Sequence, residues 1–247
     1  MDHPVIKPRA RIGVIIPSSN RMAEPNFQRF APKGVVPHFM RLRMSGDKRG
    51  EFNSFIARLG EAAAVLGDSK CDLTLLQCTG TSMSGGYGGE KTMKDAIAGA
   101  TGRPALTTAD CLMMAFDAIG VQRFVFISEN HPKGYEEKKQ FLLDAGYEIL
   151  GGSGAGLVSD QSCTTPPAFW ADLARQHRDD SADAYFISCA NIQAIDAIEE
   201  LEEELGRPVL TSNQVALWAS VRKIGIDDPM PGLGRLGASR LAETQPA

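Results

Sequence analysis

An apolar, strand-like run ends in a cysteine, with small or polar residues after it, in the stretch Leu75-Leu76-Gln77-Cys78-Thr79-Gly80-Thr81-Ser82. The same arrangement returns in Phe186-Ile187-Ser188-Cys189-Ala190-Asn191. Each cysteine therefore follows a predicted buried strand. Because ligands bind at the carboxyl ends of the strands in open parallel sheets, we expect both thiols at the binding edge of a sheet.

A second repeat follows each of these cysteines. The sequence Gly102-Arg103-Pro104-Ala105-Leu106-Thr107-Thr108 is matched by Gly206-Arg207-Pro208-Val209-Leu210-Thr211-Ser212, and a helical apolar stretch and a glycine follow both. The repeat predicts two related α/β halves, each within the usual size range of a domain. We assign residues 1–120 and 212–247 to the first lobe and residues 121–211 to the second.

Strand-like and helix-like patterns alternate along the whole chain. The predicted strands are 11–16, 36–44, 72–77, 123–128, 147–150, 184–188 and 209–210, and the predicted helices are 51–66, 90–100, 109–119, 133–145, 169–178, 192–205 and 213–224. Such alternation predicts an α/β fold with parallel sheets and helices on both faces.

Three segments are expected to be irregular. Gly85–Gly89 is rich in glycine but lacks the spacing of a phosphate loop, so we interpret it as a flexible loop of the site. Residues 151–167 are rich in Gly, Ser, Thr and Pro and predict a long loop. The tail after Asp228 carries little apolar periodicity and is expected to fray.

Composition excludes several classes of protein. The 247 residues carry a net charge of -4 with both signs interspersed, which is unsuited to nucleic acid. No apolar run reaches the roughly 20 residues that span a bilayer, and Met1–Pro4 lacks the features of a signal peptide, so we expect a cytoplasmic protein with no membrane partner. The five cysteines lack CxxC spacing and the four histidines are scattered, so we expect reduced thiols and no metal.

The residues around the first cysteine suit a small carboxylic acid. Thr79–Gly86 offers hydroxyls and unobstructed backbone amides, which can hold a carboxylate without a metal or a guanidinium. Amides at a helix N-terminus can also stabilise a thiolate, and both Cys78 and Cys189 are predicted to lie at such a place. A single buried cysteine is more often a small apolar residue of the core. Because Cys78 and Cys189 occupy matching positions in the two repeats, we favour a catalytic role for them over a place in the core.

The motifs together resemble the maleate cis-trans isomerase and arylmalonate decarboxylase group of the aspartate/glutamate racemase superfamily. The resemblance covers nearly the whole chain, and it rests on residues 11–20 (RIGVIIPSSN), Glu24-Pro25, residues 77–82 (QCTGTS), Ile187-Ser188-Cys189, residues 208–214 (PVLTSNQ) and Leu217-Trp218. It implies a cofactor-independent enzyme built of two pseudosymmetric Rossmann-like lobes, with an active-site cleft between them.

The resemblance also implies roles for individual residues. Cys78 would be the nucleophile or first acid/base, and Cys189 the second acid/base. The residues implied in substrate binding are Ser18, Asn20, Thr79, Gly80, Asn130, Tyr135 and Ala190. One departure concerns the end of the predicted strand 123–128, where the family usually has Thr-Pro-Tyr and this chain has Ser128-Glu129-Asn130. Tyr135 stands where the family often has Asn.

Three activities agree with this resemblance. The first is cis-trans isomerisation of a small dicarboxylate such as maleate, in which both cysteines act. The second is racemisation or epimerisation of an amino or hydroxy acid by two-thiol proton transfer, and the third is an arylmalonate-type decarboxylation that needs only Cys189. Relatives that decarboxylate carry glycine at the first cysteine position, whereas maleate isomerases and amino-acid racemases carry both cysteines, so the presence of Cys78 favours the first two activities over the third. A carboxylate-binding protein with an inactive site is disfavoured by the retained pair, and a homo-oligomer is compatible with the sequence.

Overall fold

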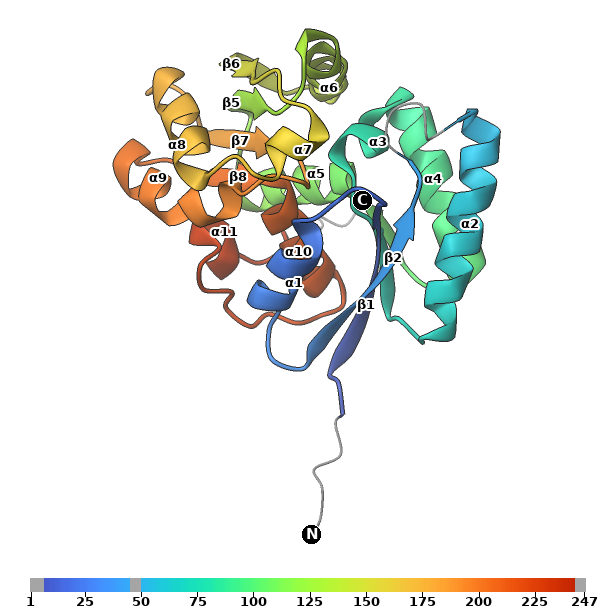
Figure 1. Ribbon diagram of the computed structural model, residues 1–247. Helices are drawn as coiled ribbons and strands as arrows, with labels where there is room; N and C mark the ends of the chain where they lie inside the picture. The colour runs from blue at the N-terminus through green and yellow to red at the C-terminus, as the bar shows by residue number, and fades with distance from the viewer. Residues whose placement is uncertain (1–6, 45–49, 243–247) are drawn as a thin grey trace.

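The computed structural model describes residues 7–44 and 50–242, and in this part of the chain the strands form two four-stranded parallel sheets (Figure 1). The first sheet has the order β2-β1-β3-β4 and the second the order β6-β5-β7-β8. The strands are β1 (Ala10–Pro17), β2 (Val35–Leu42), β3 (Leu73–Leu76), β4 (Ala105–Thr107), β5 (Arg123–Ser128), β6 (Glu148–Gly154), β7 (Ala184–Ser188) and β8 (Val209–Thr211).

The two sheets repeat one topology. In each, the first strand pairs with the second and third, and the third pairs with the fourth, all in parallel. The cysteines hold the same place, because Cys78 comes two residues after β3 and Cys189 directly after β7. The predicted α/β class and the two pseudosymmetric halves are confirmed.

Helices connect the strands and cover the sheets. They are α1 (Ala23–Phe30), α2 (Phe52–Asp68), α3 (Thr79–Met83), α4 (Gly86–Thr101), α5 (Thr108–Ile119), α6 (Pro132–Asp144), α7 (Ser159–Ser162), α8 (Pro167–Gln176), α9 (Ile198–Leu205), α10 (Ser212–Lys223) and α11 (Gly234–Ala238), with a 3-10 turn at η2 (Ala194–Ala197). The sequence patterns did not predict α1, α3, α7, α11 or strand β4, which are all eight residues or shorter. Such short elements span too few turns or alternations to show a period.

The helices α5 and α10 join the two halves. They pack against each other between the sheets (Figure 1). A single hydrophobic cluster contains buried residues from both sheets, among them Val14 from β1 and Phe186 from β7. A smaller cluster lies under α2 and α4 on one face of the first sheet. The lobe boundaries near residues 120 and 212 stay a prediction, and the extreme ends of the first lobe lie outside the described residues.

The three segments expected to be irregular are largely ordered. Gly86 begins α4, so interpreting Gly85–Gly89 as a flexible loop was wrong. Residues 151–154 belong to β6, whose register against β5 shifts between Phe124 and Val125. After this bulge Gly152 must be glycine, because a Cβ there, at φ +123°, would lie 1.7 Å from the carbonyl oxygen of Phe126. The glycines of this segment therefore suggested a loop, whereas in the structure they let strand β6 lie close to the backbone of β5.

The tail after Asp228 is held by a buried arginine. Arg222 on α10 donates hydrogen bonds to the carbonyl oxygens of Ile226, Asp228, Gly237 and Ser239. The expectation that this tail frays was wrong as far as Ala242, where the description ends. Met230, Leu233 and Leu236 are buried as well, so the tail has a short apolar spacing of three residues that was not recognised from the sequence. Within residues 7–44 and 50–242, no helix combines the length and the apolar character needed to cross a membrane.

Candidate active site

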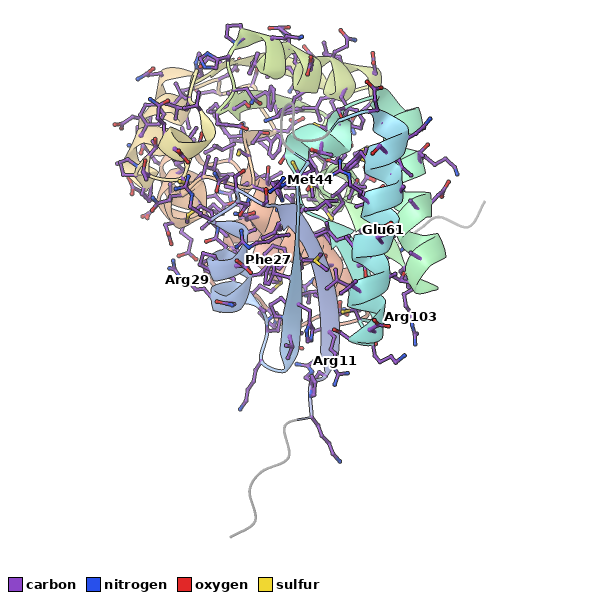
Figure 2. The ribbon with its side chains drawn as sticks, turned by 45° about the vertical axis from the view of Figure 1, so that its right-hand side comes forward. Arg11, Phe27, Arg29, Met44, Glu61 and Arg103 are labelled. Carbon is purple, nitrogen blue, oxygen red and sulfur yellow. The ribbon has the colours of Figure 1, made fainter. Side chains whose placement is uncertain are left out.

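A cavity of about 540 Å³ opens at the carboxyl ends of both sheets. Met44, which lines it, lies at the opposite end of the first sheet from Arg11 (Figure 2). The described lining residues are Pro17, Ser19, Asn20, Met44, Cys78, Thr79, Gly80, Thr81, Met83, Ser84, Glu129, Asn130, Gly134, Glu137, Lys138, Leu157, Ser162, Cys189, Ala190 and Asn191. Both cysteines thus face one cavity, with residues of both halves around them.

Cys78 is the N-cap residue of α3 and has relaxed, extended backbone with φ −158°. Its thiol hydrogen-bonds to the hydroxyl of Thr81, with a sulfur-to-oxygen distance of 3.1 Å. Burial raises the pKa of Cys78, while the hydrogen bond from Thr81 and the positive charge of Lys138 act in the opposite direction. Cys78 does lie at a helix N-terminus, as expected, although no periodic pattern predicted α3 itself. Burial outweighs the help that this helix start gives to the thiolate.

Cys189 has a strained backbone and no helix directly after it. Its φ is +141°, a region that favours glycine. The amide of Asn191 donates to its sulfur at 3.2 Å, and its own amide donates to the Ser212 hydroxyl at 3.0 Å. Burial, followed by the negative charge of Glu129, raises the pKa of Cys189 well above its ordinary value. The expectation that a helix N-terminus stabilises this thiolate was wrong, because the chain forms a turn here and the 3-10 helix starts only at Ala194.

Hydrogen bonds tie the two cysteine segments together. The Ser212 hydroxyl, which accepts from the Cys189 amide, also accepts from Thr79, the residue after Cys78, at 2.8 Å. The buried Gln77 side chain donates to the carbonyl oxygen of Ser212 and to the side chain of Asn213. These bonds fix the position of one cysteine relative to the other, and they use residues 77–79 of one repeat and 212–213 of the other.

Asn20 is buried at the cavity wall and already has protein partners. Its side-chain oxygen accepts from the amides of Met22 and Ala23 at the start of α1, and its side-chain nitrogen donates to the carbonyl oxygen of Ala190 at 2.8 Å. Asn213 donates to the same carbonyl oxygen. Asn20 therefore both caps a helix and bridges the halves. Since its amide nitrogen carries a second hydrogen, binding of a substrate carboxylate stays a prediction.

Asn130 and Gly80 face the cavity from opposite halves. The side-chain oxygen of Asn130 lies 3.2 Å from the Ser128 hydroxyl, whose single hydrogen it shares with the closer Glu129 carboxylate at 2.9 Å. Within the described part of the chain, the side-chain nitrogen of Asn130 has no acceptor. Gly80 lies in the first turn of α3, next to Lys138: a Cβ there would lie 3.7 Å from the Lys138 Cε. Thr79 and Ala190 also line the cavity, the former with its hydroxyl bonded to Ser212.

Two residues implied by the resemblance lie elsewhere. Ser18 is exposed, and Tyr135 is buried with its ring stacked on Phe126 at 4.9 Å and its hydroxyl donating to the carbonyl oxygen of that residue. Neither is among the described residues that line the cavity. The direction of Tyr135 follows from its place on α6, because that face of the helix packs on the second sheet.

Sequence reasoning missed a charged pair in the cavity wall. Glu129 and Lys138 both line the cavity and form an ion pair at 2.9 Å. A signal was present for Glu129, since it occupies the position where relatives have proline. Lys138 gave none, because a lysine in a predicted helix usually faces solvent. Within the described ranges, no three His, Cys, Asp or Glu side chains gather as metal ligands would.

Comparisons with known proteins agree with this geometry. The family described as arylmalonate decarboxylase matches residues 12–237. A maleate isomerase of Pseudomonas putida is 24% identical over 240 residues, which cover 92% of this chain and 96% of the relative.

Two solved structures are similar over nearly the whole chain. The maleate isomerase Iso of Pseudomonas putida S16, solved as a variant with maleate, has a TM-score of 0.87 at 21% identity, covering 94% of this chain and 98% of that one. A mutant maleate cis-trans isomerase of Nocardia farcinica, with a covalently bound succinylcysteine intermediate, has a TM-score of 0.84 at 22% identity, with coverages of 93% and 98%.

Proposed function

The chain belongs to the arylmalonate decarboxylase family, and from this premise we propose that it is a cofactor-independent isomerase of a small cis-unsaturated dicarboxylate of the maleate type. The observation that carries the proposal is that Cys78 and Cys189, one from each half, line the same cavity. Decarboxylation needs one proton donor, whereas addition to a double bond followed by protonation needs a nucleophile and an acid.

In the proposed reaction, the thiol proton of Cys78, whose pKa burial raises, first passes to solvent, and the resulting thiolate is the nucleophile. Its sulfur forms a bond to one alkene carbon, and the π electron pair moves to the other alkene carbon, which takes the proton of Cys189. The carbon–carbon bond is then single and rotates. Cys189 takes a proton back from the same carbon, the double bond re-forms, and the sulfur of Cys78 leaves. The succinylcysteine intermediate of the Nocardia farcinica relative supports this order of events.

Binding of the substrate carboxylates is assigned to both walls of the cavity. The first amides of α3, at Thr79 and Gly80, have no acceptor within the helix and suit one carboxylate. On the other wall, the side-chain nitrogen of Asn130 suits the second. Asn20 and Ala190 also line the cavity, and the hydrogen bond between them joins the two halves.

The experiment is a proton NMR assay of the purified protein in D₂O with maleate, aspartate, glutamate and phenylmalonate in separate tubes. We expect conversion of maleate to fumarate and no change in the other three. Exchange of the α-proton of an amino acid, without conversion of maleate, would instead identify a racemase. Loss of carbon dioxide from phenylmalonate alone would identify a decarboxylase, the activity after which the family is named.

A further inference from the structure

A buried lysine reaches the carboxyl ends of two strands of the second sheet. The Lys138 side chain, only 4% exposed, extends from α6 and donates to Glu129 at 2.9 Å, to the Ser128 hydroxyl at 3.1 Å and to the Ser188 hydroxyl at 3.3 Å. All three hydrogens of its ammonium group therefore have acceptors. A lysine this buried and this fully bonded has one fixed position, next to the residue that precedes Cys189.

Glu129 brings a carboxylate to the same wall. Its side chain is 14% exposed, and one of its oxygens accepts from both Lys138 and Ser128. The described charged or titratable side chains that line the cavity are Glu129 from the end of β5, Glu137 and Lys138 from α6, and the two cysteines. Glu129 and Lys138 are the two charges that act on Cys189.

The first half has no equivalent pair among the described residues that line the cavity. The hydrogen-bond partner of the Cys78 thiol is the neutral hydroxyl of Thr81. Burial and then the negative charge of Glu129 raise the pKa of Cys189, against the positive charge of Lys138. The pair is fixed in the cavity wall next to Cys189, because Lys138 donates to Ser188, the residue that precedes it.

We propose that the Glu129–Lys138 pair consists of two positioning residues that hold Cys189 as the protonated thiol, and thereby make Cys189 the proton donor and Cys78 the nucleophile. The assignment of these two roles rests on the proposed isomerase function. The effect of the pair on the Cys189 thiol does not, because it follows from two charges fixed in the cavity wall that Cys189 also lines.

The pair also suits the return of the proton. When Cys189 gives its proton to the substrate carbon, its sulfur becomes a thiolate beside the Glu129 carboxylate, and the repulsion favours taking the proton back. The ammonium of Lys138 limits this repulsion, so that the thiolate can exist for the time of a bond rotation. No proton leaves the pair itself, and no other reactant is needed.

The test measures the Cys189 thiol directly, without turnover. In a Cys78→Ala background, the rate of iodoacetamide alkylation of the Cys189 peptide is followed by mass spectrometry as a function of pH. We expect the pKa of Cys189 to fall by about one unit or more in Glu129→Gln, which corresponds to an increase of about tenfold in reactivity below that pKa. The matched control is Glu137→Gln, which removes another carboxylate of the cavity wall and should leave the Cys189 profile unchanged.

A second variant covers the case in which Glu129→Gln fails to fold, because that change leaves a buried ammonium without its carboxylate. The double variant Glu129→Gln/Lys138→Gln removes both charges and should lower the pKa of Cys189 by less than the single change does. Folding is checked by circular dichroism. An unshifted Cys189 profile in the folded single or double variant would overturn the proposal.

The outcome also separates this inference from the proposed function. A shifted profile in a protein that leaves maleate unchanged would support the action of the pair on Cys189 and reject the isomerase. An unshifted Cys189 profile in a protein that converts maleate would reject the proposed action of the Glu129–Lys138 pair and would leave the isomerase function supported. In an active enzyme, the alkaline limb of the pH profile of kcat should move to lower pH in Glu129→Gln, which a purely structural role would not produce.

Discussion

The segments around Cys78 and Cys189 occupy equivalent places in two sheets of the same strand order, yet they differ in backbone and in charge. Cys78 has φ −158° and starts a helix, whereas Cys189 has φ +141° and is followed by a turn. The Cys78 thiol meets the neutral Thr81 hydroxyl, and Cys189 lies beside the charge of Glu129.

The difference shows how a repeated fold can give two identical side chains different chemistry. The repeat places both thiols at the carboxyl ends of the sheets, and the local surroundings then set their protonation. The proposed division into a nucleophile and an acid therefore depends on features outside the repeated residues, namely the backbone at position 189 and the pair on β5 and α6.

The largest effect is expected from replacing each of the two cysteines in turn. We expect Cys78→Ala to lower turnover of maleate by about 10³-fold or more, because no other nucleophile replaces it. Cys189→Ser should also lose turnover but should still add substrate covalently at Cys78, which intact-protein and peptide mass spectrometry would detect. Full activity of Cys78→Ala, or an adduct on Cys189, would contradict the division of roles.

A smaller effect tests the backbone difference. Because φ +141° costs a non-glycine residue about 1–3 kcal/mol, Cys189→Gly should have a free energy of unfolding about that much higher than Cys189→Ala. Both variants lack the thiol, so the comparison isolates the strain. At the relaxed Cys78, glycine should show no such advantage over alanine. Urea unfolding of the four variants measures the difference in free energy of unfolding between glycine and alanine at each position. An equal advantage of glycine at positions 78 and 189 would contradict the proposed difference in backbone strain.

The capping boxes of α5 and α10 extend the comparison beyond the cavity. Thr107 pairs with Asp110 in the first half, and Thr211 pairs with the neutral Gln214 in the second. Beside the first box lies the buried Glu90, which accepts a hydrogen bond from Thr107 at 2.8 Å. Burial and then the charge of Asp110 raise the pKa of Glu90 from 4.5 to about 7.

This raised pKa predicts the smallest effect, a pH dependence of stability that comes from the first half. Since the folded state binds the proton more tightly than the unfolded state, the contribution of Glu90 is fully present below about pH 4.5 and is lost as the pH rises through about 7. We expect a loss of about 1–2 kcal/mol across this range, reduced from the full shift because the nearby Lys94 and solvent screen the charge.

Chemical denaturation at pH 5 and pH 8 measures this loss. In Glu90→Gln the difference between the two pH values should shrink by about 1–2 kcal/mol. Asp110→Asn should also reduce it, because the charge that helps to raise the pKa of Glu90 is gone. If neither substitution alters the pH dependence, the charged capping box is not its source.

Most of the fold could be predicted from the sequence, because long periodic segments carry it. The buried runs that became β1, β3, β5 and β7, the repeated Gly-Arg-Pro segments and the helices α2, α5, α6 and α10 were all recognisable from their patterns. Short elements such as α3 could not be recognised, and the end of β6 around Gly152 has the composition of a loop.

The sequence by itself determined that two cysteines follow equivalent strands, and so that both lie at the binding edge of an α/β protein. Only the tertiary structure decided which other side chains join them. Lys138 is nine residues from Glu129 and fifty from Ser188, and these three meet because the long Lys138 side chain reaches from α6 to the ends of β5 and β7. Tyr135, three residues earlier on the same helix, points into the core instead. These contacts depend on the order of the strands and the direction of the helix. They cannot be predicted from local sequence patterns, because burial and charge pairing arise between residues that are distant along the chain.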